Sequence, residues 1–324
     1  MPSTNEWGTL KKTVVGSATG ARIPDMDLSL RVVNYADKNN TEIQEIQTGS
    51  YPQQVINEAN EDLEIFCDFL NGEGVEVVRP NNDNPQYYNY CPRDSVLTYN
   101  TLAIATPMPI RARKDEFHAF SQHLPLVLDL QQDHADSLYN ESCINDPDTL
   151  ALEENAPAFD AANIIRANDD LLYLVSNSGN NSGAQLLQKT LGDSVGVHTL
   201  SGVYSYMHID STIAFLREGL MLLNPSRIKS KTVLPEPFRN WDAVWCPEPV
   251  DIGHYPGYCN ASTWINMNLF SVNKDLVVIE EHQNNLRIEL EKHGIECAML
   301  PMRHQRTLGG GFHCVTLDLD RNVD

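Results

Sequence analysis

The chain has 324 residues, of which 41% are hydrophobic and 8% aromatic, so it can bury the core of one large domain or two ordinary ones. Its formal net charge of -21 would repel phosphates, which argues against nucleic acids and anionic membranes as partners. No apolar run approaches the roughly 18 residues of a membrane span. The N-terminus lacks the pattern of a signal peptide, and the seven cysteines form no CxxC pair. We therefore expect a cytoplasmic protein without a zinc site or a disulfide framework.

The predicted elements repeat one pattern, in which an amphipathic helix ends near a glycine and a short β-branched strand follows. The pattern is clearest in residues 61–80, EDLEIFCDFLNGEGVEVVRP, where apolar side chains recur at helical spacing before VEVV. It returns in residues 183–200 and 284–301, and more weakly in residues 117–130. Strand-like runs lie between these segments: KKTVVGS, SVLTYNTLAIAT, DLLYLVS, STIAFLREGLMLLN and WDAVWC. This alternation predicts an α/β protein.

The order of elements favours repeated modules over a doubly wound sheet. The sequence has neither GxGxxG nor GxxxxGK[ST], the glycine-rich phosphate loops that an early strand of such a sheet would precede. A recurring strand–strand–helix–strand unit fits similar modules around a centre. No long linker rich in proline, glycine or serine divides the chain, so we expect a single domain over residues 1–324.

Polar residues interrupt apolar sequence at four places. Asp94 follows a proline and an arginine in YCPRDSVLTYN, where an aspartate is common in a turn. Asp160 lies in PAFDAANIIRA, where it could simply cap a helix. His208 and Asp210 are two residues apart in YSYMHIDSTIAFL, and on a predicted strand both side chains would point into the same space. The fourth place is LGGGFHC, which ends at Cys314.

The glycine run in LGGGFHC allows two interpretations. Glycine costs stability inside regular structure, so three in a row indicate either a flexible turn or a backbone that another group must approach closely. A lone cysteine together with a histidine and an aspartate is the set of residues needed for nucleophilic catalysis through a thiolate. Any chain of this length offers such triples, so residue types alone leave this function open.

The motifs taken together resemble one enzyme family. YSYMHID with its downstream LLNPSR, FDAA with IIRA, and LGGGFHC are closely similar to the amidinotransferases, whose best-known member is glycine amidinotransferase. NEWGTLKKTVVG and residues 51–80 are similar as well, so the resemblance extends from Asn5 to Arg321. It implies a five-bladed α/β propeller of ββαβ modules with pseudo-fivefold symmetry and an active site in the central channel.

The resemblance also implies the catalytic roles. Cys314 would be the nucleophile, His208 the general acid and base, and Asp160 the partner that orients the histidine. Gly310 and Gly311 would let the backbone approach the substrate, so that the sulfur enters the channel. The reaction would proceed by a ping-pong mechanism through an amidino-cysteine, without a metal or an organic cofactor.

Four further residues would bind the small-molecule substrate, which is L-arginine as the donor. Asp94 and Asp210 would hold the guanidinium, because two carboxylates match its fork of donors. Arg227 in NPSR and Ser262 in ASTWINMN would hold the substrate carboxylate.

The chain departs from the family pattern at two places, where Asn163 replaces a second acid after FDAA and Ala261 replaces the first of two serines. The acceptor amine is therefore the least determined part of the reaction. Glycine is the favoured acceptor, which would give guanidinoacetate and L-ornithine. Lysine, ornithine, 4-aminobutyrate and an amino sugar stay open. Residues 26–51 are expected to border the mouth of the channel.

Three other functions compete with the transferase. A hydrolase such as an arginine deiminase would use the same residue types, with water in place of the amine. A catalytically inactive arginine-binding protein would keep the fold, and a purely structural acidic protein would leave the motifs unexplained. The sequence leaves the oligomeric state open, with a homodimer as one option.

Overall fold

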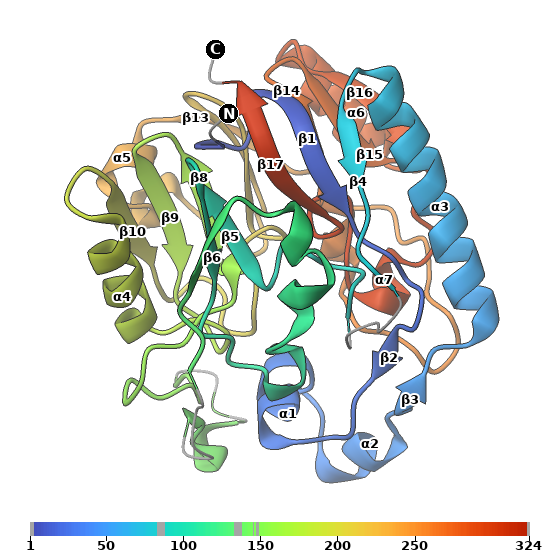
Figure 1. The fold of residues 1–324 in the computed structure, drawn as a ribbon, viewed down its shortest axis with the longest axis vertical. Coiled ribbons are helices and arrows are strands. Elements are labelled where there is room, and N and C mark those ends of the chain that lie inside the picture. Colours follow the sequence, from blue (N-terminus) through green and yellow to red (C-terminus); the bar gives the residue numbers. More distant parts are fainter. Residues whose placement is uncertain (1–2, 83–87, 133–137, 145, 147–148, 323–324) are drawn as a thin grey trace.

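Five small sheets of three strands form the body of the molecule (Figure 1). The computed structural model describes residues 3–82, 88–132, 138–144, 146 and 149–322. In each sheet, which we call a blade, the first two strands are antiparallel and the third runs parallel to the middle strand. Blades two to five follow in chain order: β5 (Val96–Tyr99), β6 (Leu102–Ala105), β7 (Leu126–Asp129); β8 (Ile164–Ala167), β9 (Asp170–Leu174), β10 (Gly196–Leu200); β11 (Ile213–Arg217), β12 (Leu220–Leu223), β13 (Asp242–Trp245); β14 (Phe270–Asn273), β15 (Leu276–Glu280), β16 (Glu296–Leu300).

Blade one joins the two ends of the described chain. Its middle strand β1 (Thr9–Val15) pairs antiparallel with β17 (Thr316–Asn322) and parallel with β4 (Glu76–Val78). Figure 1 shows β17 and β1 side by side near the two termini. The first strand and the last strand therefore complete one sheet, and this pairing closes the ring of blades.

Helices connect the parallel strands in blades one, three and five, as the sequence predicts. They are α3 (Gln53–Gly72), α4 (Asn181–Leu191) and α6 (Asn284–Lys292). Helix α3 buries a stripe at spacings of three and four residues that includes Leu63, Phe66 and Leu70, which is the apolar face of an amphipathic helix. Gly74, with a φ of 78°, then turns the chain into β4.

Blades two and four carry shorter connections. The weak helical pattern predicted in residues 117–130 is wrong, since this part of blade two consists of 3-10 turns, η2 (Glu116–Ala119) and η3 (Ser121–His123), before β7. A further 3-10 turn, η1 (Arg111–Arg113), precedes them. The buried apolar run of η2 and η3 is shorter than two helical turns, too little to stabilise an α-helix. Blade four has the 3-10 turn η7 (Lys231–Val233) and the single helical turn α5 (Glu236–Arg239) before β13.

The hydrophobic core is divided into clusters that lie between neighbouring blades. Leu317 of blade one packs in a cluster with Val96 of blade two, and Leu222 of blade four packs in one with Val277 of blade five. Equivalent clusters join blade two to three, three to four, and five back to one. Each blade thus buries both of its faces against its two neighbours, and the predicted five-bladed α/β propeller is confirmed.

One excursion from blade one extends beyond the ring. Between β1 and α3 the chain forms β2 (Arg22–Ile23), α1 (Leu28–Asn34), α2 (Asn40–Glu45) and β3 (Gly49–Ser50), and Figure 1 shows α1 and α2 at one end of the molecule. Nearer the C-terminus, η8 (Thr263–Met267) precedes β14, and α7 (Gln305–Leu308) precedes the glycine run. No helix among the described residues is long and apolar enough to cross a bilayer.

Candidate active site

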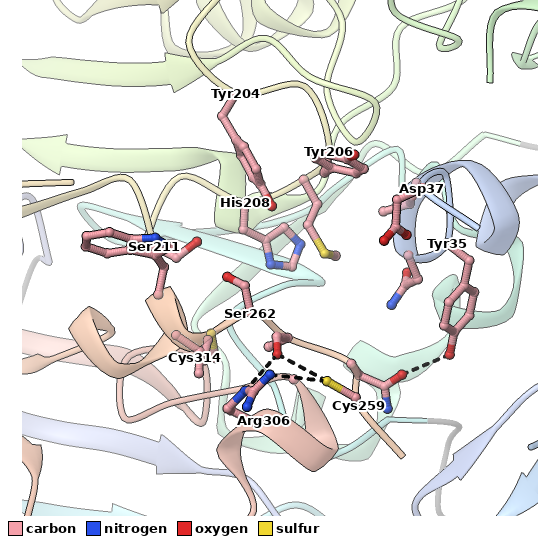
Figure 2. A pocket seen from close by; sticks show the side chains of 18 of the residues that line it. Tyr35, Asp37, Tyr204, Tyr206, His208, Ser211, Cys259, Ser262, Arg306 and Cys314 are labelled. Carbon is pink, nitrogen blue, oxygen red and sulfur yellow. Dashed lines mark hydrogen bonds between the residues drawn. The ribbon is translucent and has the colours of Figure 1, made fainter. Parts of the chain in front are cut away.

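A cavity of about 470 Å³ opens between the excursion and the ring of blades. Figure 2 shows the side chains that face it, with Tyr35 and Asp37 on one side and Tyr204, His208 and Cys314 on the other. It collects residues from five parts of the chain: 33–38, 204–211, 227, 259–265 and 306–314. The region that the sequence places at the channel mouth thus contributes residues 33–38 to its wall.

Cys314 lies at the bottom of this cavity, directly before β17. Its side chain is buried, and its Sγ lies 3.2 Å from Oδ2 of Asp210. Asn268 donates from Nδ2 to the same sulfur at 3.3 Å. A hydrogen bond with the Cys91 thiol, burial and the Asp210 carboxylate together raise the pKa of Cys314 well above its ordinary value. These contacts therefore disfavour the thiolate form of Cys314.

His208 shares the cavity with Cys314 and has a buried carboxylate behind it. Its Nε2 lies 2.9 Å from Oδ2 of Asp160. Asp160 caps the 3-10 turn η6 (Ala161–Asn163), where its Oδ1 accepts the N–H of Ala162 at 2.9 Å. Burial opposes the charged form of His208, but the carboxylates of Asp160 and Asp94 outweigh it and raise the pKa of His208 to about 9.

The predicted strand at MHID is wrong, because residues 201–212 form turns that lead into β11. The N–H of Ile209 donates to the carbonyl of Ala162, and the N–H groups of Thr212 and Ile213 both donate to Ile209. These bonds curl the backbone instead of pairing it in a sheet. The side chains of His208 and Asp210 nevertheless both reach the cavity.

Asp94 lies beside a smaller cavity of about 40 Å³ that shares His208 with the larger one. Arg113 donates from Nη1 to Oδ2 of Asp94 at 2.6 Å and binds Glu116 through Nε and Nη2, along one edge of its guanidinium. Burial raises the pKa of Asp94, and it raises the pKa of Glu116 to about 8. Oδ1 of Asp94 is buried and accepts no hydrogen bond from any described residue. One oxygen of this carboxylate is therefore open to a further donor.

Asp210 is held from the side opposite to the cavity. Its Oδ2 lies 3.1 Å from Nδ1 of His313, and Nε2 of the same ring lies 3.4 Å from Oε2 of Glu6. Burial opposes ionisation of Asp210, but the hydrogen bond from His313 and the nearby imidazoles hold its pKa well below its ordinary value. The cavity thus contains an ionised carboxylate directly next to the Cys314 thiol.

Comparison with known proteins gives the family. The chain is 41% identical over 337 residues to inosamine-phosphate amidinotransferase 1 of Streptomyces glaucescens, covering 98% of this chain and 95% of the relative. It is 29% identical to the mitochondrial glycine amidinotransferase of Xenopus tropicalis over 98% of this chain and 82% of that one. The chain belongs to the amidinotransferase family. The solved structure of an inosamine-phosphate amidinotransferase of Streptomyces griseus superposes on this amidinotransferase with a TM-score of 0.94, at 38% identity and over 100% and 97% of the two chains. No family model matches the sequence.

Most of the residues singled out in the sequence meet at the cavity of this amidinotransferase. Those that line the larger cavity are Cys314, His208, Asp210, Arg227 and Ser262. Asp94 lines the smaller cavity, and Asp160 is fully buried behind His208.

The three glycines of LGGGFHC in this amidinotransferase have different surroundings. Gly309, with a φ of 82°, lines the larger cavity, whereas Gly310 and Gly311 lie behind Cys314. A Cβ on Gly310 would come within 2.5 Å of Sγ of Cys91, and one on Gly311 within 2.8 Å of the Asn268 side chain. Packing against these neighbours accounts for the absence of a side chain at both positions.

Arg227 presents a fixed cation to the amidinotransferase cavity. Its guanidinium carbon lies 3.5 Å from the centre of the Tyr204 ring, and its Nη1 donates to the Ser211 backbone and to the hydroxyls of Ser211 and Thr212 at 2.7 to 3.0 Å. Ser262 lines the same cavity at the start of η8. A cation held by stacking and by three hydrogen bonds suits an anionic group of a ligand.

The sequence reasoning missed three residues of the amidinotransferase site. Asn268 contacts the nucleophilic sulfur from ASTWINMN, a motif in which only Ser262 drew attention. His313 is adjacent to Cys314 in LGGGFHC, and adjacency was the one available signal. Arg113 in MPIRARKDEF gave no signal, because its partner Asp94 lies 19 positions earlier, on the other side of β5 and β6.

A metal ion would have to compete with Arg113. Ligand atoms of Asp94, Asp160 and His208 lie within 4.8 Å of one another, as they could around a cation. Nη1 of Arg113 lies 2.6 Å from Asp94 and 3.9 Å from Asp160, so it already supplies positive charge to both carboxylates. The sequence predicts no metal or cofactor for this amidinotransferase.

Proposed function

We propose that the chain transfers the amidino group of L-arginine to an amine acceptor through a covalent intermediate on Cys314. The observation that carries the proposal is the convergence of the Cys314 thiol, the His208 imidazole and the Asp210 carboxylate on one cavity. Figure 2 shows Cys314 and His208 at this cavity. A thiol nucleophile with a proton-transferring imidazole is the arrangement that covalent catalysis needs. The family membership supports the same reaction class.

The guanidinium of arginine would bind between two carboxylates. Asp210 is ionised next to the thiol, and Asp94 offers an oxygen that no described residue occupies. A guanidinium presents donors along its edges in a fixed plane, which suits two separate carboxylates. These carboxylates raise the pKa of the Cys314 thiol, and the positive charge of the guanidinium would offset this increase and so favour the thiolate. Arg227 and Ser262 would hold the α-carboxylate at the other end of the substrate.

In the first half of the reaction, His208 takes the proton of Cys314 and the sulfur attacks the central guanidinium carbon. A carbon–sulfur bond forms and gives a tetrahedral adduct. His208 then delivers the proton to the nitrogen that remains on the ornithine side. The carbon–nitrogen bond breaks, ornithine leaves, and the cationic amidino group stays on the sulfur. Asp160 holds the imidazole throughout, at 2.9 Å.

The second half runs the same steps with a new amine. The neutral acceptor attacks the amidino carbon, and His208 removes a proton from the attacking nitrogen. The carbon–sulfur bond breaks and the proton returns to the sulfur, which leaves a guanidinium product and a free thiol. Water in place of the amine at this intermediate would release urea. The competing hydrolase gives citrulline instead, because ammonia leaves in its first half and the ornithine side stays on the carbon that water then attacks.

For the acceptor we place an amine of the inosamine-phosphate class before glycine, the acceptor favoured from the sequence. The relative that bears the inosamine-phosphate name is 41% identical, and the glycine amidinotransferase is 29% identical. A cavity of about 470 Å³ is also in the range that holds drug-sized ligands, and far larger than glycine needs. After ornithine has left, Arg227 could bind the phosphate of such an acceptor in place of the arginine carboxylate.

The test is the release of ornithine and citrulline from arginine with a panel of amines that includes an inosamine phosphate, glycine and lysine. Amine-dependent ornithine that disappears in Cys314→Ser supports the transferase and identifies its acceptor. Cys143→Ser is the matched control, because Cys143 lies in a 3-10 turn, does not line the cavity, and has a sulfur within hydrogen-bond distance of Ser142. Citrulline without amine dependence would instead assign a hydrolase, and arginine binding without turnover would assign a binding protein.

A further inference from the structure

The imidazole of His313 lies between two carboxylates, and neither belongs to its own segment of the chain. Nδ1 faces Oδ2 of Asp210 at 3.1 Å, and Nε2 faces Oε2 of Glu6 at 3.4 Å. A neutral imidazole has a hydrogen on one nitrogen only, so one carboxylate would face a lone pair. Both nitrogens face carboxylate oxygens, so only a doubly protonated ring would donate to both of them.

Glu6 is fixed as an anion at the far end of this arrangement. Its side chain is 6% exposed, and it receives hydrogen bonds from Arg166 at 2.8 and 2.9 Å, with Arg93 at 3.5 Å. Burial opposes its ionisation, but the charge of Arg166 and the hydrogen bond with His313 lower its pKa well below the ordinary value. The backbone carbonyl of His313 accepts a hydrogen bond from Arg93 at 2.8 Å, so Arg93 contacts both Glu6 and His313.

At the near end, one oxygen is shared by the imidazole and the nucleophile. Oδ2 of Asp210 is 3.1 Å from the His313 ring and 3.2 Å from Sγ of Cys314. A carboxylate this close to a thiol opposes thiolate formation, whereas a cation on the other side of the carboxylate offsets that effect. The charged groups that contact His313 among the described residues are Glu6, Asp210 and Arg93, and the titratable Cys314 thiol contacts Asp210.

We propose that Glu6 and His313 are positioning residues, which lock the Asp210 carboxylate against Cys314 and offset its negative charge at the sulfur. The proposal rests on the proposed roles of Cys314 and Asp210. It assigns a function to the histidine of LGGGFHC and to a glutamate of the N-terminal segment, 307 residues earlier in the chain. Neither residue touches the reacting atoms, so both act through Asp210.

The experiment compares His313→Gln with wild type. Glutamine keeps an amide donor at this position but cannot carry the charge. We expect kcat/KM for arginine to fall about 100-fold, the effect of a misplaced binding group. The pH dependence of Cys314 alkylation by iodoacetamide, followed on the Cys314 peptide by mass spectrometry, should move up by about one pH unit. Alkylation needs no turnover, so it reads the thiol directly.

The matched control is His198→Gln, which removes another histidine–carboxylate contact. Nε2 of His198 lies 2.6 Å from Asp170 in blade three, and neither residue lines the cavity. This variant should keep wild-type kinetics and the wild-type alkylation profile. A His313→Gln protein with both properties unchanged would overturn the proposal. So would a fall in kcat with an unchanged alkylation profile, because His313 would then act elsewhere.

Glu6→Gln gives a second, independent reading of the same arrangement. Without the carboxylate, one end of the His313 ring loses its partner and Asp210 is held less firmly, so kcat/KM for arginine should fall in the same direction as in His313→Gln. An unchanged kcat/KM would contradict the role of Glu6. If wild type forms no ornithine with any amine, the proposed function fails, whereas the alkylation profiles still show whether His313 controls the thiol.

Discussion

His208 is set between the carboxylates of Asp160 and Asp94, and this placement makes the reaction depend on alkaline pH. With its pKa raised to about 9, most of the imidazole is protonated near neutrality and cannot accept the proton of Cys314. We expect kcat/KM for arginine to rise about tenfold per pH unit between pH 7 and 8.5 and to level off above 9. Steady-state kinetics across this range check it.

Asp160→Asn tests the cause of that dependence. Removing a carboxylate 2.9 Å from the ring lowers the pKa of His208, so the rise in kcat/KM should move to lower pH while the maximum rate falls. A wild-type profile that is flat from pH 7 to 9 would show that a different group supplies the base.

The residues proposed for the reaction centre could be predicted from the sequence, because they stand in short motifs that resemble those of a known family. Asp160 caps a turn and His208 follows a tyrosine-rich loop, and their types alone would have left the function open. Residues that act through others had no such signal. Glu6 and Arg113 reach the site only through the fold, since Glu6 meets His313 across 307 positions in the chain.

At the scale of elements, the segment from Gly309 to Cys314 is fixed by packing. Gly310→Ala would place a methyl group 2.5 Å from Sγ of Cys91, so we expect a loss of about 1–3 kcal/mol in the free energy of unfolding and a displaced Cys314 with lower activity. The measurement is denaturant unfolding together with ornithine release.

Two further variants make this test specific. Gly72→Ala, at the end of α3, meets nothing within 4 Å and should cost no stability. Removing the sulfur in Gly310→Ala/Cys91→Ala should restore part of the lost stability, although Tyr90 and Cys314 would still lie 3.2 and 3.3 Å from the new methyl group. A double variant no more stable than Gly310→Ala would rule out the contact with Cys91 as the cause.

The predicted elements succeeded where a long amphipathic pattern was present and failed where short segments depend on tertiary contacts. Helices α3, α4 and α6 have apolar faces that a sequence displays directly. The turns of blade two and the loop at MHID have no such periodicity. Their backbones are set by distant partners, such as the carbonyl of Ala162 that holds Ile209.

At the scale of the whole molecule, Asp318 of β17 is a hub that joins several blades. It binds Arg93 before blade two, Arg166 of blade three and Arg321 of its own strand, at 2.5 to 2.8 Å. Asp318→Asn would leave three buried cations short of a partner, so we expect a loss of about 3–5 kcal/mol in the free energy of unfolding. Glu76→Gln is the control, because it breaks only a surface pair with Lys12 in the same sheet and should change stability by less than about 1 kcal/mol.

The difference in the free energy of unfolding between wild type and Asp318→Asn depends on pH through the pKa of Asp318. The three arginines outweigh burial and hold it well below its ordinary value. The carboxylate therefore stabilises the fold fully above the unfolded pKa of about 3.9, and this contribution is lost as the pH falls through the folded value. The gap between wild type and Asp318→Asn should be full at pH 6 and should narrow below pH 4. A gap that does not change with pH would contradict an ionised Asp318.

The pairing of β1 with β17 also bears on how the protein is made. On a ribosome β1 emerges early, and the strand that completes its sheet emerges some 300 residues later. Cys314 directly precedes that late strand, while Asp210 and Asn268, which contact its sulfur, have already been synthesised. The residues that contact the Cys314 sulfur thus leave the ribosome before Cys314 does. Cys314 is synthesised together with the strand that closes the ring of blades.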